Sequence, residues 1–111
     1  FMEALKTVAP VPIRFIEIDG EAKGFYQFVD KYIAVQLGMS EAQTMKTAVH
    51  ETAHAVLHDR DQMAAEGVVK DKLTKEVEAE SIAYVVCNHF RIRHFRSIRF
   101  LILRVGLLEK I

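Results

Sequence analysis

The chain has 111 residues, enough for one small domain with a single core. Half of the residues are apolar and 27% are charged, as in ordinary globular proteins, and the formal net charge is zero. The charge is uneven, because residues 1–90 carry a net −5 and residues 91–111 a net +5. No apolar run approaches the roughly 18 residues of a membrane span, and the single cysteine excludes an internal disulfide. We therefore expect a cytoplasmic protein without a membrane span.

The first part of the chain predicts a short helix and a small sheet. The helix, within residues 2–9, ends before two prolines. Residues 13–18 alternate apolar and polar side chains, as a half-buried strand does. Two further apolar runs, 25–29 and 32–37, follow a stretch rich in turn residues and are separated by only two residues. We expect the three strands to form an antiparallel meander.

The following residues predict two longer helices. Ser40 followed by Gln43 has the form of a capping box and begins a helix that reaches about His58. A polar stretch with a short helical turn leads to Thr74, which we expect to cap a helix over residues 75–90. This order of elements indicates an α+β fold. The predicted buried face of the first helix repeats at helical spacing and comprises Ala42, Met45, Val49, Ala53 and Val56.

The first of these helices carries the motif His50-Glu51-Thr52-Ala53-His54. Side chains at positions i and i+4 share a helix face, so both imidazoles can point toward one cation. Neutral imidazole is a good zinc ligand. Glu51 is placed to act as general base on a water that zinc activates. The motif therefore predicts a zinc site at His50 and His54 with Glu51 as the catalytic residue.

A catalytic zinc usually has three protein ligands, and an acidic cluster on the next helix offers the third. Glu76, Glu78 and Glu80 alternate there. Glu76 and Glu80 share a helix face, and Glu78 points away from them. We expect one of the first pair to bind zinc and the other to hold a ligand histidine through its second ring nitrogen.

The segments AVHETAHAVLHD and KEVEAESIAYVVC resemble the ImmA/IrrE-type zinc metallopeptidases, especially mobile-element relatives that resemble ArdC and LtrC. The likeness covers about residues 11–90. It implies a zincin-like, gluzincin-type fold in which a small sheet and an H-E-x-x-H helix are followed by a helix that supplies a glutamate. Members with a Glu-x-x-Ala-Asp pattern imply Glu76 as ligand and Glu80 as its supporter. The Glu-Ala-Asn form of the family aligns instead with Glu78, which leaves Glu78 as an alternative ligand.

His58 extends the series of histidines by one more turn. The helix face drifts by about 40° over each four-residue step, which moves His58 away from the first ligand. His58 also falls at the end of the helix, where a partly charged histidine interacts favourably with the helix dipole. We therefore expect His58 to stabilise the helix end and not to bind the metal.

Residues 91–111 depart from the family resemblance. Mobile-element relatives continue with a Tyr-Ile-Ala-Gly-Trp-Ser-Ser-Gly-Lys segment, and one choice of codons for residues 101–111 reads as that segment after a frame shift. We treat residues 91–111 as a basic amphipathic tail, separate from a metallopeptidase domain at residues 1–90. Its charge and apolar side chains suit self-association or contact with nucleic acid.

The leading interpretation is a zinc metallopeptidase that cleaves a protein or peptide, which the resemblance implies to be a repressor or a host defence protein. An extended substrate would add to an edge strand at residues 32–37. One alternative is a non-catalytic zinc-fold module of an antirestriction or DNA-associated protein, which would bind nucleic acid through flanking domains or the tail. Another is an inactive, truncated remnant. Glu51 favours the enzyme, because a scaffold needs no general base.

Overall fold

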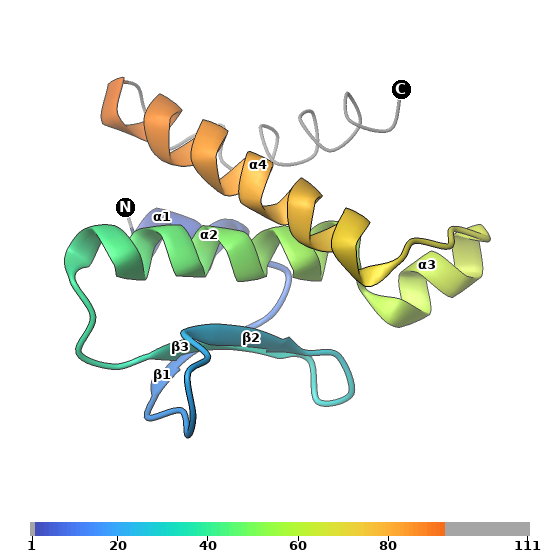
Figure 1. Ribbon diagram of the computed structural model, residues 1–111, viewed down its shortest axis with the longest axis horizontal. Coiled ribbons are helices and arrows are strands. Elements are labelled where there is room, and N and C mark those ends of the chain that lie inside the picture. The colour runs from blue at the N-terminus through green and yellow to red at the C-terminus, as the bar shows by residue number, and fades with distance from the viewer. Residues whose placement is uncertain (1, 93–111) are drawn as a thin grey trace.

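The computed structural model describes residues 2–92 as one helix, three strands and three further helices (Figure 1). The architecture is α+β, as predicted. The elements are α1 (Met2–Val8), β1 (Ile13–Ile16), β2 (Gly24–Gln27), β3 (Tyr32–Gln36), α2 (Glu41–Leu57), α3 (Arg60–Glu66) and α4 (Lys72–Ile92).

The sheet is mixed and has the strand order β1-β3-β2. β1 pairs with β3 in parallel, with Ile13 opposite Ile33, and β2 pairs with β3 antiparallel, with Phe25 opposite Ala34. The predicted antiparallel meander is therefore wrong, because β1 does not pair with β2. It follows that β3 is the central strand, so the expectation that residues 32–37 form a free edge is also wrong. Alternation of apolar side chains is common to both kinds of pairing and does not distinguish them.

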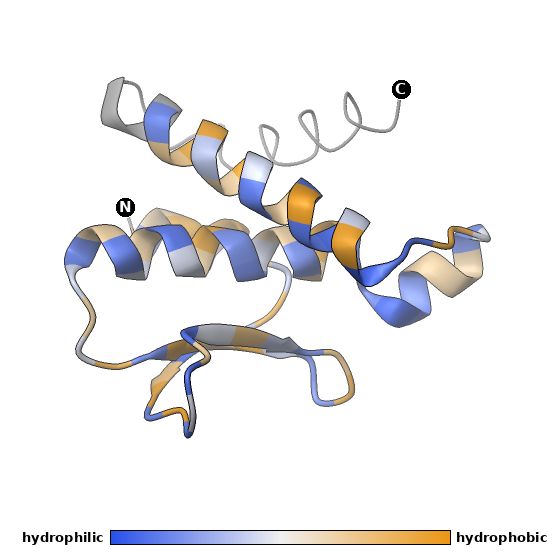
Figure 2. Ribbon diagram, viewed as in Figure 1, coloured by the Kyte–Doolittle hydropathy of each residue, from blue (hydrophilic) through white to orange (hydrophobic). Residues whose placement is uncertain are grey.

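α2 lies between the sheet and α4 and packs against both (Figure 1). Ser40 Oγ accepts a hydrogen bond from Gln43 N at 3.1 Å, so the predicted start of the helix is confirmed. Val49 and Ala53 are fully buried, as predicted. Thr52 is fully buried as well, because α2 is covered on two sides, whereas Ala42 in the first turn is exposed, contrary to expectation. Figure 2 accordingly shows hydrophobic and hydrophilic residues interleaved along α2 and α4.

The segment after α2 is more helical than predicted. Asp59 accepts a hydrogen bond from Gln62 N at 3.1 Å and begins α3, which ends at Gly67 in the left-handed conformation. α4 begins at Lys72, earlier than expected, because Asp71 Oδ1 accepts from Thr74 N at 2.7 Å. Asp71 therefore takes the capping role that we predicted for Thr74.

The core forms where α2 meets its neighbours. The fully buried side chains include Leu5 of α1, Ile33 of β3 and Ile82 of α4.

Within residues 2–92, no helix is both long enough and apolar enough to cross a membrane. The predicted basic tail at residues 91–111 lies outside the described residues, apart from the end of α4. α2 is thus held from both sides, and it carries the residues of the predicted site.

Candidate metal centre

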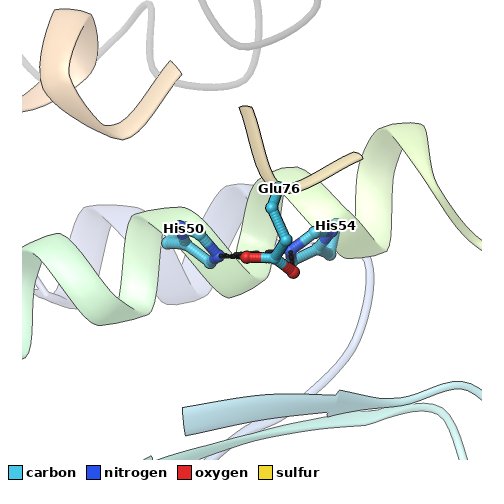
Figure 3. A group of neighbouring side chains, drawn as sticks. All are labelled: His50, His54 and Glu76. Carbon is cyan, nitrogen blue, oxygen red and sulfur yellow. Dashed lines mark hydrogen bonds and ion pairs between the residues drawn. The ribbon is translucent and has the colours of Figure 1, made fainter. Parts of the chain in front are cut away.

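His50, His54 and Glu76 lie together at the meeting of α2 and α4 (Figure 3). The two histidines are one turn apart on α2, so their rings share a face. His50 Nε2 lies 3.2 Å from His54 Nε2 and 3.2 Å from Glu76 Oε2. His54 Nε2 lies 3.1 Å from the other oxygen, Glu76 Oε1. One nitrogen from each ring and the carboxylate therefore converge on a single point.

These separations suit a small tetrahedral cation. Zinc–nitrogen distances of about 2.0–2.1 Å place two ligands of a tetrahedral ion roughly 3.3 Å apart. The ligand atoms of His50, His54 and Glu76 all lie within 4.8 Å of one another, and the closest pairs are 3.1–3.2 Å apart. Two imidazoles and one carboxylate are also a donor set that zinc accepts, so the residues fit the ion implied by the motif.

Glu51 is buried in the same cleft, with 8% of its surface exposed. Burial raises the pKa of its carboxyl to about 8, and the nearby charge of Glu76 adds to the shift. Gly24 of β2 makes room for it, since a Cβ at that position would lie 3.3 Å from Glu51 Cγ and only 2.6 Å from Thr47 Cγ2. Glu51 therefore faces β2 and lines the cleft beside the ligand cluster, of which it is not a member.

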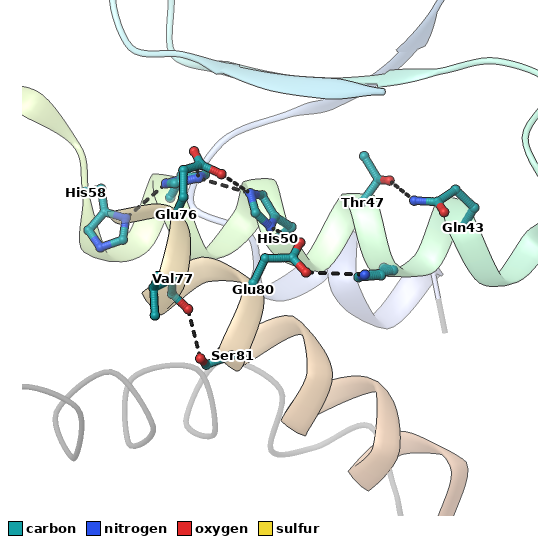
Figure 4. Close-up of polar contacts among 10 residues, drawn as sticks. Gln43, Thr47, His50, His58, Glu76, Val77, Glu80 and Ser81 are labelled. Carbon is teal, nitrogen blue, oxygen red and sulfur yellow. Dashed lines mark hydrogen bonds and ion pairs between the residues drawn. The ribbon is translucent and has the colours of Figure 1, made fainter. Parts of the chain in front are cut away.

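Glu80 lies on the other side of the first histidine (Figure 4). Its Oε1 is 2.9 Å from His50 Nδ1, and its Oε2 is 3.2 Å from Lys46 Nζ. Although the two atoms are close, His50 Nδ1 has no hydrogen bond among the described residues. Glu80 reaches the second ring nitrogen of a histidine, where the sequence places a supporting carboxylate.

His58 and Glu78 form a buried polar group that the sequence interpretation missed. His58 Nδ1 lies 2.9 Å from His54 Nδ1, and its Nε2 lies 2.7 Å from Glu78 Oε1. Lys70 Nζ contacts the same oxygen at 2.7 Å. Glu78 does point away from Glu76 and Glu80, but it points into the protein and not into solvent. The i, i+4 spacing of His54 and His58 was the signal for this contact.

Burial and hydrogen bonds set the pKa values of His54, His58 and Glu78. Desolvation, together with repulsion from His50, lowers the pKa of His54 to about 4. Desolvation also lowers the pKa of His58, although its hydrogen bond to Glu78 opposes the shift. For Glu78 desolvation would raise the pKa, but the hydrogen bonds from Lys70 and His58 outweigh it and lower the pKa. His54 and His58 are thus held neutral, which is the form in which a histidine binds a metal, while Glu78 is held ionised.

The cleft above the cluster has a volume of about 540 Å³. Aromatic residues of β2 and the following turn form one wall, and basic residues of α3 and α4 form another. Tyr26 OH donates a 2.6 Å hydrogen bond to Asp59, which fixes the end of β2 against the start of α3. The remaining lining residues of these two walls are Phe25, Phe28, Arg60, Lys72 and Lys75.

We compared the chain with protein families, with known sequences and with solved structures. A 51-residue stretch is 39% identical to an uncharacterized protein of Bacillus anthracis; it covers 46% of this chain and only 8% of that protein. No solved structure matches the chain. Residues 7–88 match the IrrE N-terminal-like domain, a peptidase family, and this range includes the whole cluster and the cleft residues. The chain therefore belongs to the IrrE N-terminal-like peptidase family.

Proposed function

We propose that this domain is a zinc-dependent metallopeptidase with a zincin-like fold. The convergence of His50, His54 and Glu76 is the observation that carries the proposal, because it provides three ligands of the right type. The three residues also line the cleft of about 540 Å³, which can admit water or a substrate group as the fourth ligand. Membership of a peptidase family supports hydrolysis of a peptide bond. The H-E-x-x-H helix and the glutamate-bearing helix supply the two halves of the site.

Glu51 is the residue that we assign to proton transfer. A bound zinc ion would supply Lewis acidity, polarising the scissile carbonyl and lowering the pKa of water. The positive charge of a bound ion would favour the ionised form of Glu51, whose pKa is raised in the metal-free protein. The Glu51 carboxylate would then accept the proton of the attacking water and deliver it to the leaving amine. Its burial beside β2 limits the access of bulk water to the carboxylate, and its place next to His50 in the sequence keeps it close to the ligand cluster.

The substrate would bind in extended form along β2. β2 is an edge strand and its residues line the cleft, whereas β3 is paired on both sides. Gln36 N donates to Lys23 O at 2.8 Å, so the main chain of Lys23 faces β3. In an antiparallel pair alternate residues face the partner strand, so the N–H and C=O groups of Gly24 and Tyr26 point toward the free edge of β2. A peptide could add to them as a further strand, with its scissile bond over the cluster. In line with the family resemblance, we propose a specific protein substrate such as a repressor or a host defence protein.

Metal content and cleavage tested together decide this proposal. The full chain should bind one zinc ion, and His50→Ala should abolish stoichiometric binding while the fold is retained by circular dichroism. The wild-type protein should cleave at least one member of a diverse panel of peptides and folded proteins, and a zinc chelator should stop the cleavage. Stoichiometric zinc in His50→Ala would reject the site. Zinc binding with no cleavage of any peptide or protein would reject the catalytic function.

A further inference from the structure

A continuous line of polar contacts leads from the ligand cluster into the protein interior. It runs from His54 through His58 and Glu78 to Lys70, with successive distances of 2.9, 2.7 and 2.7 Å. The side chains of His58, Glu78 and Lys70 are 2%, 7% and 9% exposed, so water does not compete for these contacts. Figure 4 shows His58 on the opposite side of the cluster from Glu80.

The carboxylate decides the proton positions along this line. Lys70 donates to Glu78 Oε1, and an ionised carboxylate only accepts hydrogen bonds. The nitrogen facing the same oxygen, His58 Nε2, must therefore carry a proton, because two acceptors 2.7 Å apart would repel. A buried neutral imidazole protonated at Nε2 has a lone pair at Nδ1.

The proton position of His58 in turn fixes that of His54. His58 Nδ1 and His54 Nδ1 face each other at 2.9 Å, so one of them donates and the other accepts. Since His58 Nδ1 holds the lone pair, the proton belongs to His54 Nδ1. His54 Nε2 is then unprotonated, and this is the nitrogen that faces His50 and Glu76. The Glu76 side chain is 47% exposed and can turn toward water when no metal is bound, so it does not fix a proton on His54 Nε2 as the buried Glu78 fixes one on His58.

We propose that His58 is a positioning residue for the metal site: anchored by Glu78 and Lys70, it accepts the Nδ1 proton of His54 and so directs the Nε2 lone pair of His54 toward the metal position. This inference deepens the proposed function and rests on it for the role of His54 as ligand. It replaces the role that we predicted for a partly charged His58 at the helix end, because burial lowers the pKa of this ring and keeps it neutral. It also gives Glu78 a role at the site without direct contact to the metal.

The proton positions can be measured without metal. In the full-length, metal-free chain labelled with nitrogen-15, long-range correlation spectra distinguish protonated from unprotonated ring nitrogens. We expect His54 to be protonated at Nδ1 in the wild type. His58→Phe, which keeps a ring but no acceptor, should convert His54 to a mixture of tautomers. His58→Asn should largely restore the Nδ1–H form, since its side-chain oxygen can take the place of the lone pair.

Zinc affinity provides the second measurement, by competition with a chromogenic chelator. His58→Phe should weaken zinc binding about 10–100-fold, the usual effect of removing a hydrogen-bond partner of a ligand histidine, and His58→Asn should weaken it less. Lys70→Met should also weaken binding, whereas Lys23→Met, at an exposed lysine on the loop before β2, should not.

Three results would overturn the proposal. The first is a wild-type His54 protonated at Nε2, and the second is a His54 tautomer that His58→Phe leaves unchanged. The third is zinc affinity equal to wild type in a folded His58→Phe chain. If His58→Phe does not fold, the wild-type and His58→Asn spectra still decide the matter. A wild-type chain with the expected tautomer but no zinc binding would reject the proposed function and confine the contacts of His58 to a structural role.

Discussion

Glu51 and Glu76 are two carboxylates in one cleft with contrasting surroundings. Glu51 is 8% exposed and its pKa is raised to about 8, first by burial. The Glu76 side chain is 47% exposed and lies against two imidazoles. These surroundings suit two different roles, in which Glu51 exchanges protons and Glu76 binds a cation.

Glu51→Gln should retain zinc and lose hydrolysis. The amide preserves the shape of the side chain but cannot accept a proton, and general-base catalysis contributes about 10²–10⁴-fold in rate. Metal analysis and peptide turnover, measured on one preparation, check both parts. Unchanged turnover in the variant would remove Glu51 from the reaction.

The raised pKa of Glu51 also has a consequence for the stability of the metal-free protein. The carboxyl ionises at about pH 8 when folded and near 4.5 when unfolded, so the folded state binds more protons between these values. This contribution to stability is complete below pH 4.5 and is lost as pH rises to about 8. Urea unfolding of the metal-free chain should therefore show a smaller decline in stability over this range for Glu51→Gln than for the wild type.

We expect Glu76, Glu78 and Glu80 of α4 to contribute differently to zinc affinity. Glu76→Gln should cost the most zinc affinity, since it removes the charged ligand, and Glu80→Gln should cost about 10–100-fold through its contact with His50. From the sequence alone Glu78→Gln should cost little, but its contacts with His58 and Lys70 now predict a measurable loss. Isothermal titration of the three variants gives the order. A Glu76→Gln chain that binds zinc like the wild type would contradict it.

At the level of elements, Asp59 joins three parts of the fold. It caps α3, accepts from Tyr26 OH at 2.6 Å and pairs with Lys31 Nζ at 2.6 Å. Desolvation would raise the pKa of Asp59, but the hydrogen bonds from Lys31, Tyr26 and Gln62 outweigh it and lower the pKa. One carboxylate thus holds β2, the hairpin turn and α3 in place around the cleft.

Asp59→Asn should destabilise the domain by about 1–2 kcal/mol, because asparagine still caps α3 but loses the ion pair with Lys31 and the charge-assisted hydrogen bond from Tyr26. Because the folded pKa is depressed, the contribution is present above the unfolded value of about 3.8 and is lost as pH falls through the folded pKa. Asp61→Asn is the matched control, since Asp61 also pairs with Lys31 but its side chain is 81% exposed. Chemical denaturation at neutral and acidic pH should separate the two variants, and equal effects would contradict the assignment.

The helices were more predictable than the sheet because their signals are local. Ser40 and Gln43 marked the start of α2, and the spacing of His50 and His54 placed both rings on one face. The parallel pairing of β1 with β3 depends on contacts far apart in sequence, which period-two alternation does not encode. The role of Glu78 was missed for a related reason. Its side chain points away from Glu76, and only the packing of α4 against α2 shows that it then contacts His58.

At the scale of the whole molecule, the cluster and the cleft residues described above all lie within residues 2–92. A chain that ends after Ile92 should therefore bind zinc with wild-type stoichiometry. Removal of the basic, apolar segment that follows should change solubility or oligomeric state, because its side chains favour self-association when exposed. Metal analysis and light scattering on this truncation test the two statements, and loss of zinc would show that the tail is required for the domain to form.

The placement of α2 between the sheet and α4 bears on how fast the metal would exchange. The rings of His50 and His54 are 12% and 13% exposed and belong to one helix covered on two sides, so they form a nearly rigid half-site. Glu76 is far more exposed and stands on the opposite helix, close to its beginning. Rotation of this one side chain opens the site without disturbing the core. The lifetime of the bound ion would then be governed by Glu76, and Glu76→Asp should speed dissociation more than it slows capture.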